Sequence, residues 1–166
     1  VYPETADFTF YGGIYRDVNL IAEVEKQHFS LDDCGSNALY ITPKMNGDVF
    51  VKAIISGYET GVRVLYEVFD MDGKLVASAG NRVKLHVETP HLWNGTEDPY
   101  LYTLKATLFM ESKIVDSVQS RFGFREIRFD PDEGCFLNGK HIKLKGVSRH
   151  QDREGLGNAL TINEHR

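Results

Sequence analysis

The chain has 166 residues, of which 42% are hydrophobic and 26% are charged, close to the proportions of ordinary globular domains. This composition excludes disordered, collagen-like and coiled-coil proteins, and the length fits one domain or one domain with parts of its neighbours. The chain carries 19 Lys and Arg against 24 Asp and Glu, a net charge of −5, so we expect no nucleic-acid partner. No apolar run is long enough to span a membrane, and the first residues show no signal peptide.

Short stretches of alternating apolar residues follow one another along the chain and predict β-strands. They begin with GGIYRDVNLIAEV at 12–24 and continue at 38–43, 48–55, 62–70, 75–80, 82–88, 101–110, 113–122, 122–130 and 136–147. Turn signals separate several of them, at Asn46-Gly47-Asp48, at Met71-Asp72-Gly73-Lys74 and at Asn138-Gly139. Regular strand spacing with such turns predicts an all-β fold, either a sandwich or a barrel.

The two ends of the sequence predict a fragment of a longer protein. Residues 1–11 read as part of a loop, and residues 146–166 read as a long polar loop. Thr161 and Glu164 then have the spacing of a capping box, which marks a helix start that the sequence does not continue.

Few residues outside the strands point to chemistry. The acidic stretch that starts at Asp130 has His141, not glutamate, at position twelve of a calcium loop, so a solvated turn is the better interpretation. The six histidines lack the spacing of a local zinc site. His150 differs, because it follows a predicted strand and sits in the polar cluster 148–152. It is the one histidine with a functional context.

The loop around residues 90–102 has two further features. Asn94-Gly95-Thr96 matches the N-glycosylation pattern, but this triplet is frequent by chance. Trp93, Tyr100 and Tyr102 bracket the loop, and we expect them to cap the core of the sandwich rather than to stack on a sugar.

The two cysteines, Cys34 and Cys135, do not form the framework of a disulfide-rich secreted domain. We therefore predict two unpaired thiols in a reducing compartment. The cytoplasm is the expected location, with the periplasm as the alternative, because a fragment does not display the targeting signal of its parent.

Several motifs, in order and spacing, resemble glycoside hydrolase family 2. DFTFYGGIYRDV at 7–18 resembles the end of that family's jelly-roll sugar-binding domain. Pro90-His91-Leu92-Trp93 with Asp98-Pro99-Tyr100-Leu101-Tyr102 resembles its immunoglobulin-like domain. FGFREI at 122–127, FLNGK at 136–140 and KGVSRH at 145–150 resemble the start of its catalytic barrel. GGIYRDV and GVSRHQD look most like bacterial β-galactosidases.

The resemblance implies a layout and a role. Residues 1–18 would be the tail of the sugar-binding domain, 19–125 an immunoglobulin-like antiparallel β-sandwich, and 126–166 the truncated start of a (β/α)8 barrel. The parent would hydrolyse terminal β-D-galactosides with retention of configuration, as a homo-oligomer in carbohydrate metabolism. The chain itself would be a structural linking domain whose partners are the flanking sugar-binding and barrel domains.

Two residues carry over from the family as substrate contacts. Asp7 matches the aspartate that contacts the galactose hydroxyls and, in some members, sodium. His150 matches the histidine that contacts the galactose in the transition state. Around it, Ser148 replaces the commoner Asn, and Gln151-Asp152 replace an acidic-His pair. Both catalytic glutamates and the magnesium ligands of the family lie further downstream, so we expect no catalytic residue, no metal site and no activity in this chain alone.

Two alternatives remain open from the sequence. The same architecture occurs in β-glucuronidases and β-mannosidases, which act on other sugars. A free-standing carbohydrate-binding or adhesion module is the second alternative, although such modules begin and end near strand ends.

Overall fold

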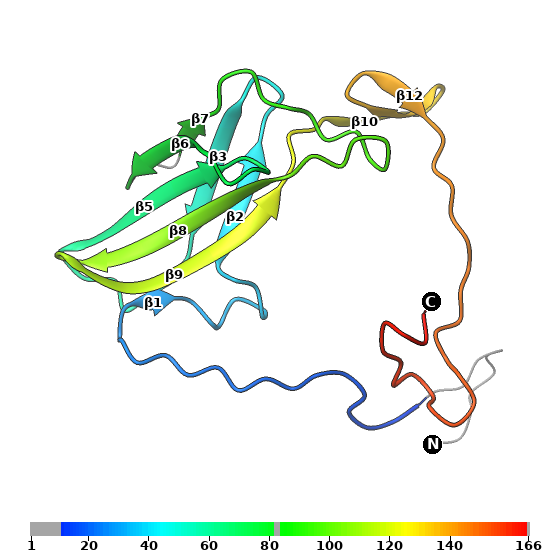
Figure 1. The fold of residues 1–166 in the computed structure, drawn as a ribbon, viewed down its shortest axis with the longest axis horizontal. Helices are drawn as coiled ribbons and strands as arrows, with labels where there is room; N and C mark the ends of the chain where they lie inside the picture. Colours follow the sequence, from blue (N-terminus) through cyan, green and yellow to red (C-terminus); the bar gives the residue numbers. More distant parts are fainter. Residues whose placement is uncertain (1–10, 82–83, 166) are drawn as a thin grey trace. The chain divides into compact units, whose positions relative to one another are not determined.

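The computed structural model describes residues 11–81 and 84–165, which contain strands and no helix (Figure 1). The strands are β1 (His28–Phe29), β2 (Leu39–Pro43), β3 (Asp48–Ala53), β4 (Ile55–Ser56), β5 (Val62–Phe69), β6 (Leu75–Gly80), β7 (Lys84–His86), β8 (Tyr102–Met110), β9 (Lys113–Phe122), β10 (Ile127–Asp130), β11 (Gly134–Leu137) and β12 (Lys140–Ile142). The predicted all-β fold class is confirmed. No helix among these residues is long and apolar enough to cross a membrane.

The chain divides into two compact units. Residues 23–143 form one unit and contain every strand of the described chain. Residues 11–22 and 144–165 form the other. The layout expected from the resemblance, with boundaries after residues 18 and 125, stays a prediction.

Two antiparallel sheets make up most of the larger unit. One has the strand order β2-β3-β7 and the other has the order β6-β5-β8-β9. The turn between β2 and β3 depends on Gly47, whose φ is +90° and where a Cβ would overlap the carbonyl oxygen of Val87. Glycine alone meets both conditions, so the turn signal seen in the sequence has a specific steric cause.

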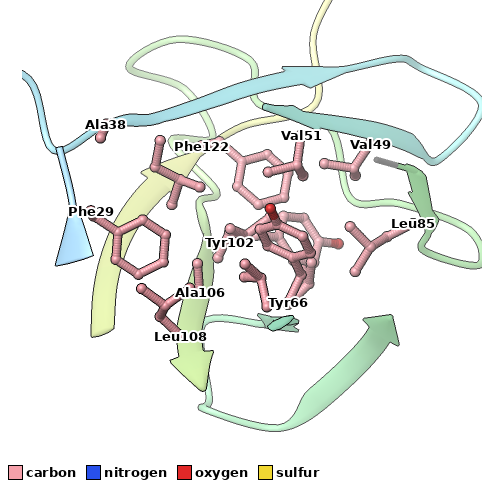
Figure 2. Packing of buried hydrophobic residues seen from close by; sticks show 14 of the residues in the cluster. Phe29, Ala38, Val49, Val51, Tyr66, Leu85, Tyr102, Ala106, Leu108 and Phe122 are labelled. Carbon is pink, nitrogen blue, oxygen red and sulfur yellow. The ribbon is translucent and has the colours of Figure 1, made fainter. Parts of the chain in front are cut away.

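The core lies between these sheets and follows from the period of two in their strands. Along β5, Val62, Val64, Tyr66 and Val68 are buried and alternate with more exposed residues. Figure 2 shows Tyr66 and Tyr102 lying opposite Val49, Val51 and Leu85 of the other sheet. Because each strand buries one face in this way, the two sheets pack face to face around one core. The immunoglobulin-like sandwich is thereby confirmed.

Aromatic rings close one end of the core, as expected for residues 90–102. Phe124 is 0% exposed, and its ring meets Tyr102 edge-on at 5.1 Å and Phe122 at 5.4 Å. The Tyr102 hydroxyl accepts a hydrogen bond of 2.9 Å from the backbone N–H of His91. The Trp93 N–H donates to the Phe124 carbonyl at 2.9 Å, so the loop is fixed to the end of the sandwich.

Gly123 is required by the same packing, and this gives a first prediction. A Cβ at this position would lie 2.8 Å from the Trp93 Cβ and 3.3 Å from a Leu101 methyl carbon. We expect Gly123→Ala to lower the free energy of unfolding by about 1–3 kcal/mol, because a packed neighbourhood must shift to admit the methyl group. Urea unfolding measures this loss. Gly80→Ala is the matched control, since its nearest contact would be an ordinary 3.9 Å, and an equal loss in both variants would contradict the steric explanation.

The third sheet, β10-β11-β12, is an antiparallel meander with the predicted hairpin at Asn138-Gly139. Asn138 has φ +50°, which asparagine tolerates better than most residues. Its side-chain oxygen accepts from the Glu126 N–H at 2.9 Å, and its amide nitrogen donates to the Trp93 carbonyl at 3.0 Å and to the Asn94 side-chain oxygen at 2.8 Å. Asn138 therefore links the hairpin to the loop at 90–98 through its hydrogen bonds to Trp93 and Asn94.

The acidic stretch between β10 and β11 is a turn, as interpreted from the sequence. The Asp130 carboxylate accepts hydrogen bonds from the backbone N–H groups of Glu133 at 2.9 Å and Asp132 at 3.0 Å. These two donors, the Glu133 group first, hold the pKa of Asp130 below its ordinary value. Cys135 in β11 is buried, Cys34 is exposed, and both thiols are free.

Two expected strands are not formed. Residues 12–24 contain no strand, and Leu20 and Val24 are 97% and 94% exposed. The segment after β12 is also without a strand through residue 150, and Val147 is 92% exposed. A strand needs a neighbour for its backbone N–H and C=O groups, and no described residue pairs with either segment. The prediction of a strand at 12–24 is therefore wrong, and so is the predicted continuation of the last strand over 143–147.

The contacts of Asp48, at the start of the central strand β3, predict a pH dependence of stability. Its carboxylate contacts Lys84 at 2.9 Å and His86 at 3.0 Å, and these contacts, Lys84 first, lower its pKa to about 2 from 3.8. The Asp48 carboxyl group binds its proton less tightly in the folded state than in the unfolded state. Its charged form therefore stabilises the fold above pH 3.8, and this stabilisation is lost as pH falls toward 2. We expect the thermal midpoint of the wild type to fall more steeply over this window than that of Asp48→Asn, as followed by circular dichroism. Parallel curves for the two proteins would contradict the assignment.

Candidate functional site

The candidate site lies in the smaller unit, where the segment after residue 147 folds back on itself. The Arg153 N–H donates to the Gly157 carbonyl at 3.1 Å, and the Gly157 N–H donates to the Arg153 carbonyl at 2.8 Å. Gly157 has φ +57°, and a Cβ there would lie 3.0 Å from the ring of Tyr11. A glycine is thus needed where residues 153–157 pass close to the segment that begins at Tyr11.

Half of the predicted capping box is formed at the end of this segment, because the Glu164 side chain reaches the Thr161 N–H but the Glu164 N–H does not bond the Thr161 hydroxyl. The Thr161 N–H donates to the Glu164 carboxylate at 2.8 Å, and the Thr161 hydroxyl donates to the same oxygen. The Glu164 N–H closes the turn by donating to the Thr161 carbonyl at 3.2 Å. The hydroxyl donor and then the backbone donor lower the pKa of Glu164, which keeps the carboxylate charged at neutral pH.

His150 lines a cavity of about 370 Å³ in this unit. The other lining residues are polar or aromatic: Tyr15, Arg16, Ser148, Arg149, Gln151, Asp152 and Asn158. Hydroxyl, amide, imidazole and guanidinium groups can all donate hydrogen bonds, and several can also accept them. A cavity with such a lining suits a ligand with many hydroxyl groups, such as a sugar.

The charge of the cavity is mainly cationic. Arg16 and Arg149 line it opposite the single lining carboxylate, Asp152. Arg149 donates to the Nδ1 atom of His165 at 2.9 Å, and the Arg16 guanidinium lies 5.7 Å from the centre of the Tyr15 ring. Neither partner, the imidazole of His165 or the ring of Tyr15, carries a negative charge. These contacts therefore leave the positive charge of both arginines in place.

The structure places some of the predicted site residues and not others. It brings His150 together with Ser148, Gln151 and Asp152, as the sequence suggested. Asp7 lies outside the described residues. Sequence reasoning missed Tyr15 and Arg16 as lining residues, although both belong to the GGIYRDV motif. Both residues lie in a predicted strand, and a strand pattern does not indicate that they line a cavity together with residues 148–158.

The described residues that line this cavity do not include the carboxylate pair of a retaining glycosidase mechanism. Such a mechanism needs two carboxylates about 5–5.5 Å apart, and Asp152 is the single carboxylate lining this cavity. Nor do residues 11–81 and 84–165 contain a group of three or more His, Cys, Asp or Glu side chains placed to hold a metal ion. The resemblance places the magnesium ligands further downstream, and Asp7, its possible sodium contact, lies outside the described residues, so no chemical step is assigned to either ion.

Comparison with known proteins identifies the family. Residues 37–125, which include the sandwich strands β2 to β9, match the family described as glycosyl hydrolases family 2. This match covers more than half of the chain. The chain belongs to glycosyl hydrolases family 2. The resemblance found in the sequence motifs is thereby confirmed.

The relatives within family 2 carry two different names. A β-glucuronidase of Bacteroides fragilis is 36% identical over 99% of this chain. A β-galactosidase of Thermoanaerobacter pseudethanolicus is 26% identical over 93% of the chain. Among solved structures, the FMN-binding β-glucuronidase of Facaelibacterium prausnitzii L2-6 is 37% identical over 99% of the chain, with a TM-score of 0.86.

The chain corresponds to a part of these family 2 proteins. It spans 26% of the length of the Bacteroides fragilis β-glucuronidase and 27% of the Facaelibacterium prausnitzii chain. The family 2 assignment thus places this chain in a glycoside hydrolase family, while about three quarters of the length of these two relatives lies outside the part that it matches.

Proposed function

We propose that the chain is the structural linking part of a retaining family 2 glycosidase that acts on β-D-glucuronides. The observation that carries this proposal is the 36% identity to a β-glucuronidase over 99% of the chain. A solved β-glucuronidase structure with a TM-score of 0.86 supports it. In this role the sandwich would join a sugar-binding domain to a catalytic barrel.

The sugar differs from the one first expected from the motifs. GGIYRDV and GVSRHQD favoured a galactoside, and the Thermoanaerobacter pseudethanolicus β-galactosidase supports that second candidate at 26% identity. Three relatives at 34–36% identity are named β-glucuronidases or putative β-glucuronidases, whereas a β-galactosidase of Halalkalibacterium halodurans is 32% identical. This ranking favours glucuronic acid over galactose as the sugar.

The residues of this chain would bind the substrate rather than break its bond. His150 lines the polar cavity and would donate or accept a hydrogen bond with a sugar hydroxyl. Asp7, carried over from the family, would accept hydrogen bonds from sugar hydroxyls through its carboxylate. The acid/base and nucleophilic carboxylates would come from the rest of the longer protein, as would any magnesium ligands.

The test compares two substrates and two proteins. The full-length protein that carries this chain should hydrolyse nitrophenyl β-D-glucuronide with a kcat/KM at least about 100-fold above that for nitrophenyl β-D-galactoside, because a site built for a carboxylate leaves charged groups unpaired with a neutral sugar. The 166-residue chain alone should hydrolyse neither. A preference for the galactoside would overturn the choice of sugar, and turnover by the chain alone would overturn the structural role.

A further inference from the structure

A second concave surface lies on the side of the sandwich and is independent of the His150 cavity. Strands β2 and β9 belong to different sheets and come into contact along this side. The pocket there has a volume of about 470 Å³. Its apolar lining comes from Ile41, Pro43, Leu101 and the rings of Trp93 and Phe122, and its charged lining comes from Arg121 and Arg125.

The two arginines of this pocket have no ion-pair partner among the residues that the structure describes. Arg121 and Arg125 are both exposed, and within the described part of the chain neither lies within ion-pair distance of Asp or Glu. Arg128, a few residues further on, shows the contrast, because it contacts Asp130 at 2.9 Å and Glu133 at 3.7 Å. Two guanidiniums without an ion-pair partner among the described residues therefore line one pocket of a chain whose net charge is −5.

The pocket is held in shape by the packing around Trp93. The Arg125 guanidinium lies 4.8 Å from the centre of the Trp93 ring, a cation–π contact that orients it. Trp93 is in turn fixed by its hydrogen bond to the Phe124 carbonyl and by its close approach to Gly123. A donor that is already positioned loses less conformational entropy when a ligand binds.

We propose that this pocket binds a carboxylate that is attached to a compact apolar body. The guanidiniums of Arg121 and Arg125 would donate charge-assisted hydrogen bonds to the carboxylate oxygens, which is the recognition that arginine favours. The apolar body would lie against Ile41, Pro43 and Leu101. Two ligand classes are compared: an aromatic acid, whose ring is apolar, and a uronic acid residue of a glycan, whose hydroxylated ring offers an apolar surface only through its C–H groups; the experiment below separates them.

The experiment uses Trp93 as the reporter, because it is the single tryptophan of the chain. The 166-residue protein is titrated with sodium D-glucuronate and, separately, with sodium benzoate, while tryptophan fluorescence and calorimetry are recorded. D-Glucose, benzyl alcohol and sodium sulfate serve as the ligand controls. We expect a saturable response to at least one carboxylate that is absent with its neutral counterpart and with sulfate. Tighter binding of D-glucuronate identifies a glycan ligand, and tighter binding of benzoate identifies an aromatic acid.

Matched variants test whether the arginines carry the binding. Arg121→Gln and Arg125→Gln should each weaken the apparent affinity about tenfold, as expected for the loss of one charge-assisted contact. Lys105→Gln removes one exposed positive charge from β8 outside the pocket and should leave the affinity unchanged. The proposal is overturned if neither carboxylate gives a saturable response, if sulfate or the neutral ligands bind equally well, or if Lys105→Gln weakens binding as much as the arginine variants.

Discussion

Replacing Phe124 by alanine is expected to lower the free energy of unfolding by about 3–5 kcal/mol, the usual cost of truncating a buried phenylalanine. Phe124 is fully buried and packs edge-on against Tyr102 and Phe122 at the end of the core. The end of the core cannot collapse freely into the space, because the neighbouring loop is fixed by the hydrogen bond between the Trp93 N–H and the Phe124 carbonyl. The cavity would therefore persist and add to the lost transfer free energy.

Urea unfolding followed by Trp93 fluorescence measures this loss. Phe129→Ala is the matched control, because Phe129 lies a few residues away in β10 and its side chain is 71% exposed. That variant should change the free energy of unfolding by no more than about 0.5 kcal/mol. A loss below about 1.5 kcal/mol for Phe124→Ala, or similar losses for both variants, would show that the aromatic end is not part of the cooperative core.

The fold was predictable wherever a strand has one buried face and a partner in the chain. The predicted bounds of β6 and β9 agree with the structure, and β5 is one residue shorter than predicted. In these strands burial on one side imposes the period of two on the sequence, and turn residues such as Gly73, with φ +80°, mark their ends. Pattern and structure then have the same physical cause.

Pattern alone failed where the partner of a strand is not among the described residues. Residues 12–24 carry strand-like alternation, yet Leu20 and Val24 are almost fully exposed and no strand forms. Alternation reports that a segment can bury one face, and it does not report what would cover that face. The segment after β12 differs from expectation for the same reason.

The candidate site was predictable in part. His150 stood out because a polar cluster follows an apolar stretch, and it lines the polar cavity. Tyr15 and Arg16 line the same cavity but come from the other end of the chain. The contact of Asn138 with Trp93 and Asn94 was equally hidden, although both motifs were recognised. Contacts between distant segments are properties of the tertiary fold, and neither composition nor spacing encodes them locally.

A large loss of activity is also expected from His150→Ala in the full-length glycosidase that we propose. The family's histidine contacts the sugar in the transition state, so its loss should lower kcat about 10- to 100-fold while KM changes less. This range corresponds to the loss of one hydrogen bond together with the partner that it leaves unsatisfied. Steady-state kinetics with nitrophenyl β-D-glucuronide and nitrophenyl β-D-galactoside separate the two parameters.

Two further variants define what the His150 result means. His141→Ala removes another exposed histidine, from β12 in the larger unit, and should leave kcat unchanged. Asp7→Ala should lower kcat at least as much as His150→Ala, because a carboxylate accepts charge-assisted hydrogen bonds from sugar hydroxyls. If His150→Ala instead raises KM at constant kcat, the histidine binds the ground state and the transition state equally. Wild-type rates in both His150→Ala and Asp7→Ala would show that this chain has no substrate-binding role. Only the structural role of the sandwich would then remain.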